Sequence, residues 1–106
     1  MAGVKEIVNA KIAGKKVMVF SKSYCPFCTK AKQAFQQLIS EGVLPTDDYE
    51  VMEIENHPNC DDIQNYLGTL TGGRSVPRVF VNGEFLGGGD DTVRMKQNGE
   101  LEAKLR

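Results

Sequence analysis

The chemistry suggested by this 106-residue chain centres on its cysteines: two of the three bound a Cys-Pro-Phe-Cys motif at residues 25–28, and the third is Cys60. Two thiols at this spacing can perform thiol–disulfide exchange, in which one sulfur attacks and the other resolves. They can also supply half of a structural zinc site, which takes four protein ligands. The remaining cysteine and the single histidine complete that metal alternative, a site of Cys25, Cys28, His57 and Cys60.

The elements around the motif favour the redox interpretation. The apolar run 17–20 predicts a buried strand, and apolar residues at helical spacing predict a helix over 26–40 with Pro26 at its first position. Cys25 is then the N-cap residue, where unpaired N–H groups and the helix dipole favour a thiolate, and Lys22 adds a nearby positive charge. Cys28 follows one turn later, within disulfide reach. We therefore expect Cys25 to attack and the more buried Cys28 to resolve.

The rest of the chain supplies a sheet and its helices. Helices are predicted over 3–13 and from Asn56 or Asn59 onward, with Pro58 in the first turn of the latter, and strands over 49–54, 78–81 and 84–86. Asn82-Gly83 indicates a type I′ hairpin, and a final helix of about 15 residues is expected to begin at the acids 90–91. This order predicts one α/β domain over residues 1–106, a thioredoxin-like fold with a central four-stranded mixed sheet flanked by helices.

Composition narrows the possible partners and location. The net charge is −1, with 41% hydrophobic and 25% charged residues, which is ordinary for a soluble globular protein. No strong overall field draws the chain to nucleic acid or a membrane surface, and no apolar stretch reaches signal-peptide or membrane-span length. We expect a cytoplasmic monomer that uses its cysteines for redox chemistry instead of structural disulfides.

Four segments resemble the dithiol glutaredoxins, and together they span essentially the whole chain. They are residues 22–28, 63–67, 74–81 and 87–91, in the order of that family, with Phe27 where tyrosine is more frequent and Ser75 where threonine is usual. The resemblance implies an enzyme, a glutathione-dependent oxidoreductase that reduces protein–glutathione mixed disulfides and protein disulfides. Glutathione would be a co-substrate with no tightly bound cofactor, and glutathione reductase would be an indirect partner.

The resemblance also implies a groove for glutathione beside the attacking sulfur. Pro77 would be a cis-proline that leaves the backbone of Val76 free to pair with the cysteinyl backbone of glutathione, as a short added strand. Phe27 would be an exposed aromatic side chain next to the sulfur, with inward packing as its alternative.

The two ends of glutathione call for opposite charges. Lys22, Gln64 and Arg74 would bind the glycyl carboxylate, although each is also explained as an ordinary surface residue. The N–H groups of residues 89–90 and the carboxylate of Asp91 would bind the γ-glutamyl end, since a helix N-terminus binds a carboxylate well. The implied groove residues are Lys22, Phe27, Gln64, Arg74, Val76, Pro77, Gly89, Asp90 and Asp91. Asp90 and Asp91 are alternatively no more than helix caps.

Two other functions remain as alternatives. A thioredoxin is disfavoured because its tryptophan before the motif is missing: the chain has no tryptophan. A dimeric iron–sulfur scaffold, with Cys25 and glutathione as ligands, is disfavoured by Pro26. Cys60 at a predicted helix start is interpreted as an incidental thiol, although that position could activate it.

Overall fold

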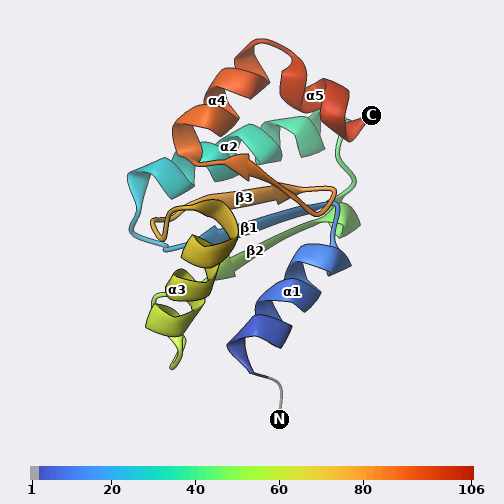
Figure 1. The fold of residues 1–106 in the computed structure, drawn as a ribbon. Helices are drawn as coiled ribbons and strands as arrows, with labels where there is room; N and C mark the ends of the chain where they lie inside the picture. The colour runs from blue at the N-terminus through green and yellow to red at the C-terminus, as the bar shows by residue number, and fades with distance from the viewer. Residues whose placement is uncertain (1–2) are drawn as a thin grey trace.

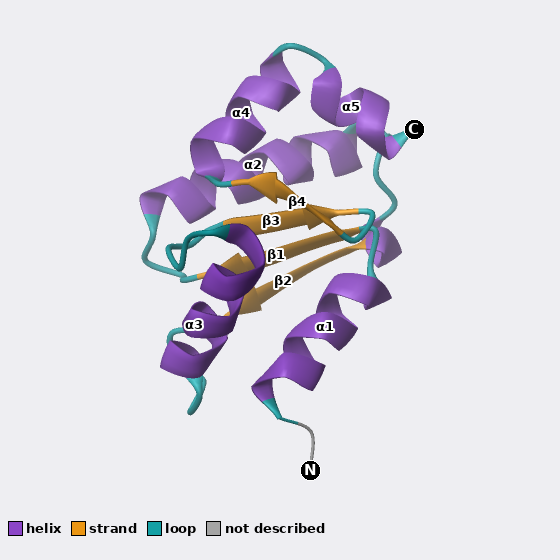
Figure 2. Cartoon of the chain, in the orientation of Figure 1, coloured by secondary structure: helices purple, strands orange, loops and turns teal. Residues whose placement is uncertain are grey.

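The computed structural model describes residues 3–106, which form helices packed on both faces of one sheet (Figures 1 and 2). In chain order the elements are α1 (Val4–Gly14), β1 (Val17–Ser21), α2 (Pro26–Ser40), a short 3₁₀ turn (Thr46–Asp48), β2 (Tyr49–Glu53), α3 (Cys60–Thr71), β3 (Arg78–Val81), β4 (Glu84–Gly87), α4 (Gly89–Gln97) and α5 (Glu100–Leu105).

The sheet has the strand order β2-β1-β3-β4. Strands β1 and β2 are parallel, with Val17 opposite Tyr49, whereas β3 is antiparallel to both β1 and β4. The parallel pair is connected through α2, as a parallel pair requires a crossover. The predicted mixed sheet of four strands flanked by helices is therefore confirmed.

The central strand β1 is buried on both faces, so its alternating side chains enter two separate cores. Val17 and Val19 pack with side chains of α2, α4 and α5, including Phe35 and Leu101. Met18 and Phe20 face the other way and pack with residues of α1 and α3. All residues of β1 are buried, which explains why this strand reads as a continuous apolar run. The two layers hold the carboxyl end of β1, and hence the cysteine motif, in a fixed position.

Short sequence patterns correctly predicted the position of a helix and of a hairpin turn. Helix α2 spans Pro26–Ser40, as predicted, with proline in its first turn. Asn82 and Gly83 have φ angles of 53° and 82°, so the hairpin turn has both central residues in the left-handed region that a type I′ turn needs. The hairpin brings β3 back beside β4 and fixes the position of the residues that precede β3.

Two details of the predicted helices were wrong. The final helix is broken: α4 ends at Gln97 and α5 begins at Glu100, because Gly99 adopts a φ of 86° and Asn98 accepts a hydrogen bond from the Glu100 N–H at 2.9 Å. Pro58 lies in a turn before α3 and not in its first turn, since the N-cap is Asn59. Of the helices within residues 3–106, none combines the length and apolar character needed to cross a bilayer.

Candidate active site

Cys25 occupies the N-cap position of α2, immediately after the loop that follows β1. Its sulfur accepts a hydrogen bond from the Cys28 N–H at 3.3 Å, so it takes up one of the unpaired donors of the first helical turn. On its other side the thiol lies 3.7 Å from the Val76 carbonyl oxygen. The half-buried sulfur is thus held between the N-terminus of α2 and the loop before Pro77, with a backbone N–H donor on one side and a carbonyl oxygen on the other.

Cys28 has the opposite environment, although it is also a free thiol. Its side chain is fully buried, and burial, with a smaller contribution from the hydrogen bond to Cys25, raises the pKa of Cys28 to about 11. The thiol form of Cys28 is therefore strongly favoured at neutral pH. The structure thus separates an accessible sulfur at a helix N-terminus from a protected, protonated one a turn away.

A polar groove of about 290 Å³ lies next to the motif, since it is lined by Phe27 and by Val76, whose carbonyl oxygen is 3.7 Å from the Cys25 sulfur. The Val76–Pro77 peptide bond that forms one wall is cis, as predicted. The first turn of α4 forms the opposite wall, and it approaches α2 closely: a Cβ on Gly89 would lie 2.6 Å from the Phe27 carbonyl oxygen. Six of the nine predicted groove residues line this space: Phe27, Val76, Pro77, Gly89, Asp90 and Asp91.

Asp91 is a charged groove residue that also caps α4. Its carboxylate accepts hydrogen bonds from the Gly88 N–H and the Arg94 guanidinium, each at 3.1 Å. The first of these bonds, followed by the second, lowers the pKa of Asp91, so the group stays ionised. The helix-cap role is thereby shown, and the same residue also lines the groove, so the cap does not exclude a role in binding.

Arg78 also lines the groove, although it was not among the residues predicted from the sequence. Its guanidinium donates a hydrogen bond to the Ser75 hydroxyl at 3.0 Å and lies 5.2 Å from the centre of the Phe85 ring. Burial lowers the pKa of Arg78, while Asp91 acts in the other direction. A cation directly after the predicted cis-proline, at the start of a strand, was the signal that could have identified it.

The three residues expected at the glycyl end lie outside this groove lining. Gln64 is only 8% exposed, and its amide donates a hydrogen bond to the Arg74 carbonyl oxygen at 2.8 Å. Arg74 is exposed and bonds to Asn65 at 3.1 Å, while Lys22 is half-buried in the loop before Cys25. Gln64 therefore ties helix α3 to the segment that leads to Val76.

The metal alternative receives no geometric support. Within residues 3–106, no group of three or more histidine, cysteine, aspartate or glutamate side chains is placed to hold a metal ion. The Cys60 thiol instead donates to the Gln64 side-chain oxygen at 3.5 Å, and the His57 ring accepts from the Asn59 N–H at 3.0 Å.

A strand that leads into a Cys-x-x-Cys motif at a helix N-terminus, opposite a cis-proline, defines a thiol–disulfide oxidoreductase of the thioredoxin-like fold. The glutaredoxin family model matches residues 17–86. Glutaredoxin-1 of Rattus norvegicus is 44% identical over 103 residues, covering 96% of this chain and 92% of that protein. The chain therefore belongs to the glutaredoxin family, which comprises glutathione-dependent oxidoreductases.

Solved structures agree with this family and with the fold. Oxidised glutaredoxin 2 of Chlamydomonas reinhardtii has a TM-score of 0.83 and 51% identity, with 96% of this chain and 89% of that chain covered. A buckwheat glutaredoxin–glutathione complex has a TM-score of 0.84 and 30% identity, with 96% and 86% covered. The predicted thioredoxin-like fold is thereby confirmed.

Proposed function

We propose that this glutaredoxin reduces protein–glutathione mixed disulfides, with Cys25 as the nucleophile and Cys28 as the resolving thiol. The observation that carries the proposal is the contrast between the two sulfurs. Cys25 is partly accessible at the N-terminus of α2 and lies 3.7 Å from the carbonyl oxygen of the groove residue Val76, whereas Cys28 is buried with a pKa raised to about 11. Two thiols in such different environments suit different steps of one exchange reaction.

In the first step the Cys25 thiolate attacks the glutathione sulfur of the mixed disulfide. A sulfur–sulfur bond forms between Cys25 and glutathione while the original one breaks, and the substrate protein leaves as a thiolate that takes up a proton. The thiolate of a second glutathione then attacks the glutathione sulfur on Cys25. Glutathione disulfide leaves and the Cys25 thiolate is restored, so the net electron donor is glutathione.

A protein disulfide follows a second route through Cys28. Attack by Cys25 on one substrate sulfur gives a covalent protein–protein disulfide and releases the other sulfur as a thiolate. Cys28 transfers its proton as it attacks the Cys25 sulfur, which forms the Cys25–Cys28 disulfide and frees the second substrate thiol. Two molecules of glutathione then reduce the enzyme. Because its pKa is raised to about 11, little of Cys28 is thiolate at neutral pH, and we expect its attack on the Cys25 sulfur to be slower than that of an ordinary thiol.

We place glutathione in the groove between residues 75–78 and 88–91. The backbone of Val76 would pair with its cysteinyl residue, and Asp91 with the α4 N-terminus would hold the ammonium and carboxylate of its γ-glutamyl end. Lys22, Gln64 and Arg74 remain our candidates for the glycyl carboxylate, since the Gln64 amide has a second N–H donor besides the one bonded to the Arg74 carbonyl. A glutathione complex of the buckwheat relative supports glutathione as the ligand.

We further propose a cytoplasmic monomer in which residues 1–106 form one glutaredoxin domain that acts on glutathionylated or disulfide-containing proteins. Glutathione reductase would keep its co-substrate reduced, and a net charge of −1 gives no reason to expect nucleic acid or membrane partners. Size-exclusion chromatography tests whether the protein is a monomer, and cell fractionation tests whether it is cytoplasmic.

The function is tested by turnover of a small glutathionylated disulfide with two electron donors in parallel. One reaction contains glutathione, glutathione reductase and NADPH, and the other contains thioredoxin reductase and NADPH. We expect turnover only with glutathione. Turnover only with thioredoxin reductase would contradict the proposal and assign the site to a reductase-fed protein.

A further inference from the structure

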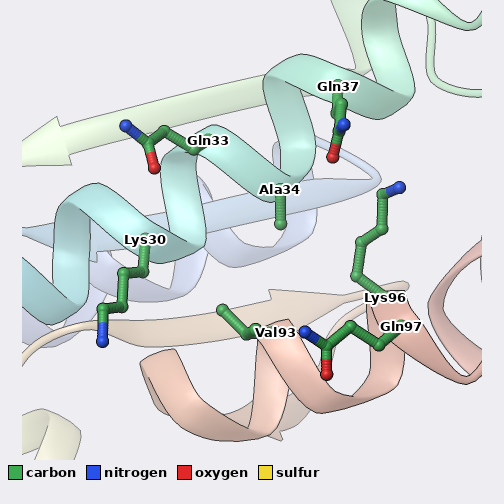
Figure 3. Close-up of a pocket in the computed structure, with 7 residues that line it drawn as sticks. All are labelled: Lys30, Gln33, Ala34, Gln37, Val93, Lys96 and Gln97. Carbon is green, nitrogen blue, oxygen red and sulfur yellow. The ribbon is translucent and has the colours of Figure 1, made fainter.

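A second groove, distinct from the glutathione groove, runs between α2 and α4. It measures about 350 Å³, and Figure 3 shows side chains projecting into it from both helices. Its floor is apolar, formed by Ala34 and Val93, while its rim carries amides and amino groups. The complete lining is Lys30, Gln33, Ala34, Gln37, Val93, Lys96 and Gln97. An apolar floor with a polar rim is the usual composition of a surface that binds a polypeptide.

The charge of this groove is positive. Its two ionisable lining residues are Lys30 and Lys96, and no carboxylate lines it among residues 3–106. Lys96 lies 3.9 Å from Glu41, which is half-exposed at the far end of α2. Within the same described residues Lys30 forms no ion pair, and its amino group lies over the Phe27 ring at 5.4 Å from the ring centre. The groove is thus complementary to carboxylates, particularly at the end nearer the active site.

The groove also begins one helical turn from the residues that line the glutathione groove. Phe27 lines the glutathione groove, and Lys30, one helical turn later, begins the second groove. The two grooves follow one another along α4 in the same order: Gly89 packs against Phe27, and Val93 follows one turn later. From Cys25 to Gln37 the helix rises by about 18 Å. An extended polypeptide covers that distance in roughly five residues.

We propose that the α2–α4 groove binds an acidic segment of the substrate protein, located about two to six residues from the cysteine whose disulfide Cys25 attacks. Carboxylates of the segment contact Lys30 and Lys96, and an apolar side chain covers Ala34 and Val93. The glutamine amides bond to the backbone of the segment. This inference rests on the proposed function and gives it a substrate preference, because glutathione itself does not reach this surface.

The test compares substrates that differ only in this segment. In two glutathionylated peptides, aspartate and leucine stand about four residues before the cysteine or about four residues after it. Each is compared with a peptide that has serine at the same positions. A small glutathionylated disulfide without any segment reports the basal reaction. We expect a lower KM for the acidic peptide than for the serine peptide, with the acidic segment either before or after the cysteine. The kcat should be unchanged, and added salt should reduce the difference in KM.

Matched variants then locate the effect on the protein. Gln37→Glu and Lys96→Glu place a carboxylate in the groove, whereas Gln36→Glu and Lys104→Glu make the same charge changes at exposed positions outside its lining. Each groove variant should raise the KM for the acidic peptide by roughly threefold, as expected for one partly exposed charge pair. The controls should leave that KM unchanged, and turnover of the small disulfide should be the same in all variants.

Two results would overturn the inference while the proposed function stands: equal KM values for acidic and serine peptides, or an equal rise in KM for Gln36→Glu and Gln37→Glu. Absence of turnover of the small disulfide by the unaltered protein would instead refute the proposed function. In that event, fluorescence anisotropy with the labelled, unreacted peptides and the same variants still decides whether the groove binds the acidic segment.

Discussion

Replacing Cys25 and Cys60 by serine leaves Cys28 as the single thiol, so that its reactivity can be measured directly. Burial is the main cause of its pKa, raised from 9.0 to about 11, and burial remains when the smaller contribution of Cys25 is removed. A pKa higher by about two pH units reduces the thiolate fraction at neutral pH about a hundredfold. The thiolate is the form that reacts with alkylating reagents, so Cys28 should react at least about a hundredfold more slowly than an ordinary thiol.

The assay is iodoacetamide alkylation of this variant at pH 7, followed by mass spectrometry, in buffer and in denaturing urea. The urea sample is the control, since the unfolded chain exposes the same thiol with its ordinary pKa. The folded rate should also rise about tenfold for each pH unit up to about pH 11, where the pKa of Cys28 lies. A folded rate within tenfold of the unfolded one would refute the burial argument, and with it the division of roles between the two cysteines.

The same pKa has a consequence for stability. The unfolded chain releases the Cys28 proton near pH 9.0, whereas the folded protein keeps it until about pH 11. Stabilisation from the buried neutral thiol is therefore complete below the lower value and is lost as the pH rises through this window. A Cys28→Ser variant should show a smaller loss of stability over that range.

Three further substitutions test other parts of the account. Asp91→Asn removes the negative charge at the N-terminus of α4, which should destabilise the protein by about 0.5 kcal/mol and raise the KM for glutathione. Because its pKa is lowered from 3.8 by folding, the stability that Asp91 gives is present above that pH and fades below it, so acid unfolding curves of the two proteins should converge. Arg78→Gln removes the bond to Ser75 and the contact with Phe85, and we expect a higher KM for glutathione with an unchanged Cys28 pKa. Gly99→Ala, at a φ of 86°, should lower the free energy of unfolding by about 1 kcal/mol in urea titrations, and no change would contradict the helix break.

Much of the fold could be predicted because its signals are local. Pro26 and the apolar spacing after it determine where α2 begins and which side it buries, and Asn82-Gly83 determines the hairpin turn. The break at Gly99 was missed because a glycine inside a helical pattern lowers helix stability by only about 1 kcal/mol, so tertiary packing decides whether the helix continues. Leu101 and Leu105, which follow the break, are both buried in the core.

In the site, too, features set by neighbouring residues could be predicted from the sequence, whereas those set by tertiary contacts could not. The position of Cys25 follows from its place between a strand and a proline-started helix, and the structure has it at the N-cap. The direction of the Arg78 side chain depends on Phe85 in the next strand, which no local pattern encodes. Likewise, Gln64 is turned inward by the Arg74 carbonyl, a contact between residues ten positions apart.

The most direct test of the central claim is the glutathione-coupled turnover of a glutathionylated substrate by the unaltered protein, Cys25→Ser and Cys28→Ser. The account predicts no turnover by Cys25→Ser and largely intact turnover by Cys28→Ser, because glutathione itself resolves the intermediate on Cys25. Turnover that survives in Cys25→Ser, or is lost in a folded Cys28→Ser, would contradict it.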